Sequence, residues 1–176
     1  MTTQKPQAIW SFVPFSRELD RQSFDCGKSA LNKYLQISAN QHQKSDISRI
    51  TVAVPAQDTK VIAGYYTLNA SRLNVESLSA GYRKKLPQHL EIPSIKIGQM
   101  AVDQRYSGQG LGKKLLMNAL YSCYVISGQL AVHSVTVDAY DDDAKNFWLH
   151  YSFIPFADRS ESLFLPMKTI RALFDN

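Results

Sequence analysis

The chain has 176 residues, of which 44% are hydrophobic and 20% are charged, and these are ordinary values for a globular protein. A chain of this length can bury a core without help from disulfides or metals. No apolar run reaches the roughly 20 residues of a membrane span, and the first residues lack the apolar core of a signal peptide. We therefore expect one domain, residues 1–176, in the cytoplasm.

The net charge of +5 favours a polyanionic partner, such as nucleic acid or CoA, but does not identify one. Because there is no secretory signal, Cys26 and Cys123 are expected to be reduced thiols. We expect no metal, since the histidines are scattered without the spacing of metal ligands. They are His42, His89, His133 and His150.

Hydrophobic patterning predicts strands and short helices in the first half of the chain. The expected strands are residues 8–15, 50–54 and 61–68, of which the last two are joined by a polar hairpin loop. Residues 30–35 carry an apolar helical face, and the polar segment 36–48 is interpreted as a frayed helix end or a loop. Residues 75–86 predict a short helix and a basic loop.

The second half of the chain predicts a βαβ unit. An apolar run at residues 95–102 leads towards a long amphipathic helix that begins near Gly110. Its buried stripe starts with Leu111 and Leu115, and the helix ends before Gly128. A further apolar strand is expected at residues 132–137, and two strands separated by a helix imply parallel neighbours.

An acidic turn follows, and Asp142 or Asp143 in this turn could cap the next helix, expected at residues 144–151. The remaining expected elements are strands at residues 153–156 and 162–165 and a short helix at residues 167–174.

The loop between the apolar run and the long helix carries three glycines in five positions, Gly108, Gly110 and Gly112. At the start of a helix the first N–H groups have no partner within the helix, and the macrodipole adds partial positive charge, so an anion such as phosphate is favoured. Glycine allows positive φ and removes the Cβ from the path of a bound group. The alternative is a glycine-rich turn that binds nothing, but Arg105 and Lys113 in the same loop argue against it.

Two common phosphate-binding patterns do not fit this loop. A P-loop requires glycine where Ser107 stands, and serine or threonine where Lys114 stands. The dinucleotide pattern G-x-G-x-x-G fails because Gly108 and Gly110 are followed by Lys113 at the third glycine position.

The remaining pattern, Arg105-x-x-Gly108-x-Gly110 directly after a strand, resembles the acetyl-CoA diphosphate loop of the GNAT N-acetyltransferases. The order of the expected elements over residues 13–165 is also similar to the GNAT fold. The resemblance implies an α/β (α+β) fold with a mixed central sheet of about six to seven strands. It further implies an antiparallel N-terminal meander, a βαβ core for acetyl-CoA and flanking helices.

A narrower resemblance is to GNAT toxins of type II toxin–antitoxin operons, which acetylate the α-amino group of aminoacyl-tRNA. The similar segments include Phe24-Asp25-Cys26-Gly27 and continue over residues 24–31, 61–68, 100–103, 107–112, 144–147 and 163–165. This resemblance implies acetyl-CoA as co-substrate, aminoacyl-tRNA as acceptor and a block of translation. It also implies a ribbon-helix-helix antitoxin that masks the active site, and a homodimer.

The GNAT resemblance assigns cofactor contacts to the strand, the loop and a later helix. They are Met100, Ala101, Val102, Arg105, Ser107, Gly108, Gln109, Gly110, Leu111, Gly112, Lys113 and Asn146. Backbone N–H groups of residues 109–113 would hold the diphosphate, and the strand edge at residues 100–102 would face the pantetheine arm and polarise the thioester carbonyl. Arg105 and Lys113 are candidates for phosphate contacts, whereas Lys114 is interpreted as a solvated surface charge.

The sequence departs from the family at the usual proton donor. Many members have tyrosine in a Phe-Tyr-x-x-x-Gly-Phe context, but residues 147–153 place Trp148 at the tyrosine and Ser152 at the glycine. An indole N–H is not an acid at neutral pH, so Trp148 is expected to line the substrate pocket. Tyr151 is the substitute catalytic candidate, with an aromatic that packs on the sheet as its alternative.

This departure leaves three functions open. The first is acetylation of aminoacyl-tRNA, whose backbone could meet Arg49, Arg72, Arg83, Lys84 and Lys85. The second is acetylation of a small amine or a protein N-terminus. The third is a catalytically weak CoA-binding module that acts through an antitoxin.

Overall fold

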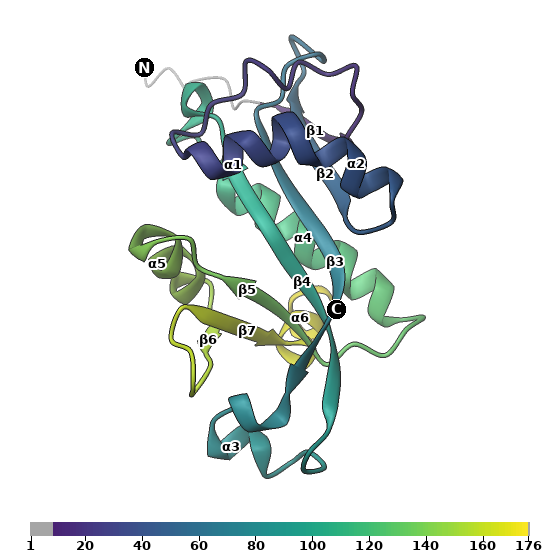
Figure 1. Ribbon diagram of the computed structural model, residues 1–176, viewed down its shortest axis with the longest axis vertical. Coiled ribbons are helices and arrows are strands. Elements are labelled where there is room, and N and C mark those ends of the chain that lie inside the picture. The colour runs from purple at the N-terminus through teal and green to yellow at the C-terminus, as the bar shows by residue number, and fades with distance from the viewer. Residues whose placement is uncertain (1–8, 176) are drawn as a thin grey trace, which may run out of the picture. The chain divides into compact units, whose positions relative to one another are not determined.

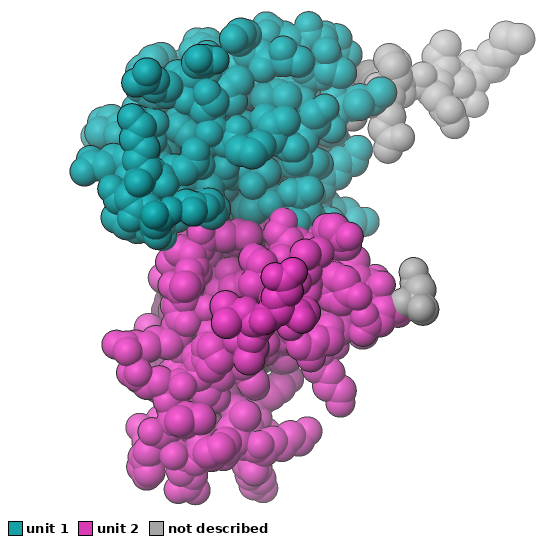
Figure 2. Space-filling view, turned by 90° about the vertical axis from the view of Figure 1, so that its right-hand side faces the viewer, with its two compact units in different colours: residues 1–67, 99–118 teal, residues 68–98, 119–176 magenta. Residues whose placement is uncertain are grey.

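The computed structural model describes residues 9–175, so Ala8 of the first expected strand lies outside the described residues. The chain forms two compact units, shown in teal and magenta in Figure 2. One unit comprises the chain up to Thr67 together with Gln99–Asn118, and the other comprises Leu68–Gly98 and the chain from Ala119 onward. That the chain works as one acetyltransferase domain stays a prediction.

Within residues 9–175, seven strands form one mixed sheet in the order β1-β2-β3-β4-β5-β7-β6 (Figure 1). They are β1 Trp10–Pro14, β2 Arg49–Pro55, β3 Gly64–Asn74, β4 Glu91–Val102, β5 Ser134–Asp138, β6 Ile154–Pro155 and β7 Ser162–Pro166. β1 and β2 are antiparallel, and so are β5 and β7. β4 and β5 are parallel, paired from Ser94–Ser134 to Ile97–Val137, as the βαβ prediction required. The predicted mixed α/β fold is confirmed.

The helical elements lie between and after these strands. They are α1 Ser29–Lys33, the π-helical turn η1 Tyr34–Ser38, α2 Ala39–Lys44, the 3-10 turn η2 Val75–Ser77, α3 Ala80–Arg83, the 3-10 turn η3 Gln104–Tyr106, α4 Leu111–Ser127, α5 Asp142–His150 and α6 Met167–Phe174. The long amphipathic helix and the closing helix therefore lie where hydrophobic patterning predicted them.

The interpretation of residues 36–48 as a frayed end or loop was wrong for residues 36–44, because η1 and α2 continue the helical path to Lys44, and only residues 45–48 form a loop. Leu35 and Ala39 are fully buried, which fixes one face of this path in the core. On its polar side, the Gln43 amide donates from Nε2 to the Phe15 carbonyl at 2.9 Å and accepts from the Ile50 N–H at 3.3 Å. Gln43 therefore links α2 both to the segment before it, at Phe15, and to the strand after it, at Ile50.

Two further predictions needed correction. Residues 75–86 form η2 and α3 rather than one short helix, since Leu78 is extended between them at ψ 151°. The cap of α5 is Asp141, whose Oδ1 accepts from the Ala144 N–H at 2.8 Å, and not Asp142 or Asp143. These two residues lie inside the first turn, where their negative charges interact favourably with the positive end of the helix dipole.

Each unit has its own apolar cluster. The first unit buries, among others, Phe15, Phe24, Leu35, Val52 and Tyr65. The second buries Leu73, Val75, Leu78, Ile92, Phe156 and Phe164. Cys26 and Cys123 are both free thiols, as predicted, and burial raises the pKa of Cys123 to about 12.

The end of α5 carries a strained residue at the position that is glycine in the family pattern. Ser152 follows the helix with φ 69°, in the left-handed region. A side chain in this region costs about 1 kcal/mol or more relative to glycine. We expect Ser152→Gly to raise Tm by about 2–4 °C in a thermal melt, because it removes this strain. Ser45→Gly, at φ −91°, is the matched control and should not raise Tm; a rise of equal size in both variants would contradict this explanation.

Candidate active site

The strand, the glycine loop and the helix that were predicted to hold the cofactor follow one another directly, and the end of the strand, the loop and the start of the helix belong to the first unit. β4 ends at Val102, η3 follows, and α4 begins at Leu111. Gly108 and Gly110 have φ values of 73° and 80°, so both positions favour glycine on conformational grounds. A Cβ built on either residue would meet nothing within 4 Å. Both glycines therefore border open space that a bound group can occupy.

The start of α4 has the polarity that an anion requires. Its first turn contains no acidic residue. The Lys114 N–H donates to the Gly110 carbonyl at 3.3 Å, and the N–H groups of the preceding residues point out of the helix end. The dipole of this 17-residue helix adds partial positive charge at the same place. A diphosphate fits this combination of donors, charge and open space.

Close packing fixes the first turn of α4 against β3. Leu111 and Leu115 are buried on the underside of the helix. A Cβ on Gly64 of β3 would come within 2.8 Å of Leu115 Cδ1 and 3.0 Å of the Ala101 carbonyl oxygen. Only glycine permits this approach, so the helix start is held in place before any ligand arrives. Since the Leu111 side chain is buried, only its backbone can face a cofactor.

Two of the basic side chains in this segment are already engaged. The Lys114 ammonium lies 5.1 Å from the centre of the Trp10 ring, so it packs on an aromatic face and is not simply a solvated charge. Arg105 donates from Nε and Nη2 to the two oxygens of Asp103, at 2.9 and 3.0 Å. Lys113 is exposed.

Asp103, which had no predicted role beyond its place in the family-like segment 100–103, is the most heavily bonded carboxylate in this segment. Its side chain is 1% exposed, and it also accepts from the N–H groups of Arg105 and Asp25. Burial raises its pKa, but hydrogen bonds from Arg105 and Asp25 outweigh this, and the pKa lies below its usual value. Asp103 is therefore ionised at neutral pH. The only signal for it in the sequence was an acidic residue two positions before a loop arginine.

The other predicted site residues lie in the second unit, Asn146 and Trp148 on α5 and Tyr151 directly after it. Asn146 and His150 are exposed. Trp148 is buried, and its ring centre lies 5.0 Å from that of Phe147 and 5.1 Å from that of Phe153.

Tyr151 follows the last turn of α5 and is half-buried. Its ring centre lies 4.9 Å from that of Phe147 and 4.9 Å from that of His150. Tyr151 is thus partly accessible and braced by two rings, whereas Trp148 is part of the packed interior.

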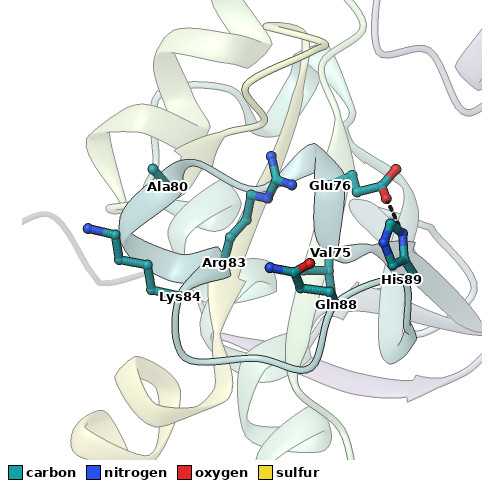
Figure 3. A pocket seen from close by; sticks show the side chains of 7 residues that line it. All are labelled: Val75, Glu76, Ala80, Arg83, Lys84, Gln88 and His89. Carbon is teal, nitrogen blue, oxygen red and sulfur yellow. Dashed lines mark hydrogen bonds and ion pairs between the residues drawn. The ribbon is translucent and has the colours of Figure 1, made fainter.

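A basic hollow lies beside α3 in the second unit and has a volume of about 220 Å³ (Figure 3). It is lined by Val75, Glu76, Ala80, Arg83, Lys84, Gln88 and His89. Glu76 and His89 are joined by a hydrogen bond of 2.7 Å between Oε1 and Nδ1 on one side of the hollow, and Arg83 and Gln88 also line it (Figure 3). Arg83 and Lys84 were predicted to be able to meet a nucleic acid backbone, and both are exposed.

Within residues 9–175, no group of three or more His, Cys, Asp or Glu side chains could hold a metal ion. In the same described part of the chain, no helix is both long enough and apolar enough to cross a membrane.

Comparison with known proteins identifies the family. No protein-family model matches the chain. The probable toxin TacT of Sinorhizobium fredii is 30% identical over 161 residues, which cover 88% of this chain and 88% of that protein. This chain belongs to the GNAT acetyltransferase toxins. A tRNA-acetylating toxin of Mycobacterium tuberculosis is 29% identical to this GNAT toxin over 154 residues, which cover 88% of this chain and 90% of that one.

Solved structures of GNAT toxins agree with the fold described above. A KacT variant with tyrosine replaced by phenylalanine superposes with a TM-score of 0.88 at 30% identity, covering 94% of this chain and 99% of that one. AtaT in complex with acetyl-methionyl-tRNAfMet gives a TM-score of 0.86 at 29% identity, with the same coverage. Other similar structures contain AtaT with its antitoxin AtaR and acetyl-CoA, and KacTA with DNA.

Proposed function

We propose that this GNAT toxin transfers the acetyl group of acetyl-CoA to the α-amino group of aminoacyl-tRNA and thereby blocks translation. The observation that carries the proposal is the start of α4, where two glycines with positive φ border open space before a helix without acidic residues in its first turn. Membership of the toxin family supports the choice of acceptor, since AtaT has been solved with acetyl-methionyl-tRNAfMet.

In this proposal the cofactor contacts are the residues predicted from the sequence. The N–H groups of residues 109–113 hold the diphosphate, with Lys113 and Arg105 as charged neighbours. Met100, Ala101 and Val102 lie on β4 past the end of its pairing with β5 at Ile97, so their backbone is a candidate partner for the pantetheine arm. Ser107 of the loop and Asn146 of α5 are the further proposed contacts to the cofactor. We also propose that the chain works as one acetyltransferase domain.

The reaction that we propose is direct attack of the neutral amine on the carbonyl carbon of the thioester. The carbon–nitrogen bond forms as the carbon–sulfur bond breaks, the amine loses a proton, and the departing thiolate gains one. Backbone N–H groups near residues 100–102 stabilise the negative charge that develops on the carbonyl oxygen. Tyr151 is the proposed proton donor to the thiolate, because the indole of Trp148 cannot be an acid at neutral pH. The buried side chain of Trp148 on α5 is proposed to support the wall of the acceptor pocket.

The proposed partners follow from the relatives. We propose that an antitoxin with a ribbon-helix-helix part masks the active site, since AtaT has been solved with the C-terminus of AtaR and KacTA with DNA. We further propose that the toxin is a homodimer and that it works in the cytoplasm, where its acceptor is found.

The function is tested by incubating the protein with radiolabelled acetyl-CoA and a pool of charged tRNA. We expect label on RNA that mild base releases, and no label on deacylated tRNA. Label that appears only on small amines or on a protein N-terminus would contradict the proposed acceptor. Saturable binding of acetyl-CoA without any transfer would contradict the proposed chemistry, and would instead favour a module that acts through its antitoxin.

The basic hollow beside α3 gives a prediction about tRNA binding. If Arg83 and Lys84 each contact one phosphate, the double variant Arg83→Gln/Lys84→Gln should reduce the slope of log K against log salt concentration by about 1–2. Filter binding of charged tRNA between low and physiological salt measures this slope. Lys168→Gln, an exposed lysine of α6 in the same unit, is the control and should leave the slope unchanged. Equal slopes for the double variant and the wild type would exclude these contacts.

A further inference from the structure

Asp103, at the entry to the diphosphate loop, is hydrogen-bonded to Asp25, which lies 78 positions earlier in the chain. Oδ2 of the buried Asp103 accepts from the Asp25 N–H at 3.0 Å, and the Gln104 N–H donates to the Asp25 carbonyl at 2.9 Å. The Asp103 N–H in turn donates to the Ala63 carbonyl of the segment before β3, at 2.9 Å. Three segments of the first unit therefore meet at Asp103, directly before the loop.

The early segment is a turn closed by its own hydrogen bonds. The Asp25 carboxylate accepts from the Gly27 N–H at 2.8 Å and from Asn32 Nδ2 at 2.9 Å, while Asn32 Oδ1 accepts from the Cys26 N–H at 2.9 Å. Gly27 has φ 83°, and a Cβ on it would come within 2.4 Å of Gln104 Nε2. The turn at residues 25–27 is thus pressed against the loop entry. The Phe24-Asp25-Cys26-Gly27 motif has no other role in the proposed function.

Asp103 also sets the orientation of Arg105. Its two oxygens take the backbone N–H, Nε and Nη2 of Arg105, at 2.9, 2.9 and 3.0 Å. Nη1 takes no part in this pair, and the arginine side chain is 48% exposed although its partner is 1% exposed. The guanidinium is therefore clamped along one edge while its other edge faces outward.

We propose that Asp103, braced by the turn at residues 25–27, is a positioning residue that orients Arg105 and fixes the loop entry for the diphosphate of the acetyl donor. The inference rests on the proposed function and deepens it. Asp103 itself does not touch the substrate, because its acceptor sites are filled by Arg105 and Asp25. A carboxylate is needed there, because asparagine at this position would place its NH2 group, a hydrogen-bond donor, against the N–H donors of Arg105 or Asp25.

The test compares the wild type with Asp103→Asn. We expect the Kd for acetyl-CoA, measured by calorimetry, to rise about tenfold, because charge-assisted hydrogen bonds that hold the loop are lost. With S-acetyl-pantetheine, a thioester that lacks the diphosphate, kcat/KM for charged tRNA should change less than twofold. Asp158→Asn, which removes a carboxylate bonded to Ser77 in the other unit, is the control and should leave both quantities unchanged.

An unchanged Kd for acetyl-CoA in Asp103→Asn would overturn the inference. A fall of kcat/KM for charged tRNA by the same factor with acetyl-CoA and with S-acetyl-pantetheine would also overturn it. A general loss of folded protein gives that result, whereas a role in diphosphate binding affects acetyl-CoA alone. Arg105→Gln provides an independent variant: if Asp103 acts through Arg105, the double variant should bind acetyl-CoA no more weakly than the weaker single variant, whereas additive effects contradict the inference. If the wild type binds acetyl-CoA but transfers nothing, the proposed function fails, and the Kd comparison still decides the role of Asp103.

Discussion

Replacing Gly110 with valine is expected to weaken acetyl-CoA binding about 100-fold or more, which is the loss of one or two charge-assisted hydrogen bonds. Gly110 has φ 80°, a conformation that a β-branched residue adopts only with strain. We expect the variant to relieve this strain by turning the N–H groups at the start of α4 away from the diphosphate. In addition, the new side chain would project into the space that is open beside the glycine.

Calorimetry with acetyl-CoA measures this effect, and Gly81 offers a matched control. A Cβ on Gly81 also meets nothing within 4 Å, but this residue lies in α3 without a positive φ. Gly81→Val should therefore bind acetyl-CoA like the wild type. If Gly110→Val binds as tightly as Gly81→Val, the start of α4 does not hold the cofactor.

Replacing Tyr151 with phenylalanine is expected to lower kcat about 100-fold, the lower range of the effect of general acids, while the Kd for acetyl-CoA stays unchanged. The substitution removes only a hydroxyl from a half-buried ring that packs on Phe147 and His150, so the packing is retained. Trp148→Phe should change kcat much less, because an indole N–H gives no proton to a thiolate.

Single-turnover transfer to charged tRNA separates these two variants. Since Trp148 is buried, its truncation also lowers stability, and the reaction is best followed well below the Tm of that variant. Small and equal effects of Tyr151→Phe and Trp148→Phe would remove Tyr151 from the mechanism. The thiolate would then leave unprotonated or take its proton from water, which is feasible because a thiol has a pKa of about 8.5.

The parts of the fold that could be predicted are those determined by residues close together in the sequence. The glycine loop follows from a conformational demand that only glycine meets at Gly108 and Gly110. The helix after it follows from the spacing of Leu111 and Leu115, which are both buried. The strands that flank it are apolar runs of sufficient length, and the order of the elements along the chain resembled the GNAT fold, whereas the order of the strands in the sheet was not predicted.

The parts that were missed depend on partners that lie far away in the sequence. Helix α2 is polar and was interpreted as a frayed helix end or a loop, yet Gln43 joins it to Phe15 and Ile50. Asp103 is a buried anchor only because Asp25, 78 positions earlier, folds against it. Neither pairing leaves a periodic signal. Trp148 was noticed because it departs from a family pattern, but the pattern could not indicate that the side chain is part of the packed interior.

The central claim is that the N–H groups at the start of α4 bind the diphosphate of acetyl-CoA. Amide hydrogen exchange of residues 109–113, measured with saturating acetyl-CoA and with S-acetyl-pantetheine, tests it most directly. We predict that acetyl-CoA slows exchange across these residues and that the donor without a diphosphate does not. Saturation with acetyl-CoA that leaves their exchange unchanged would contradict the claim.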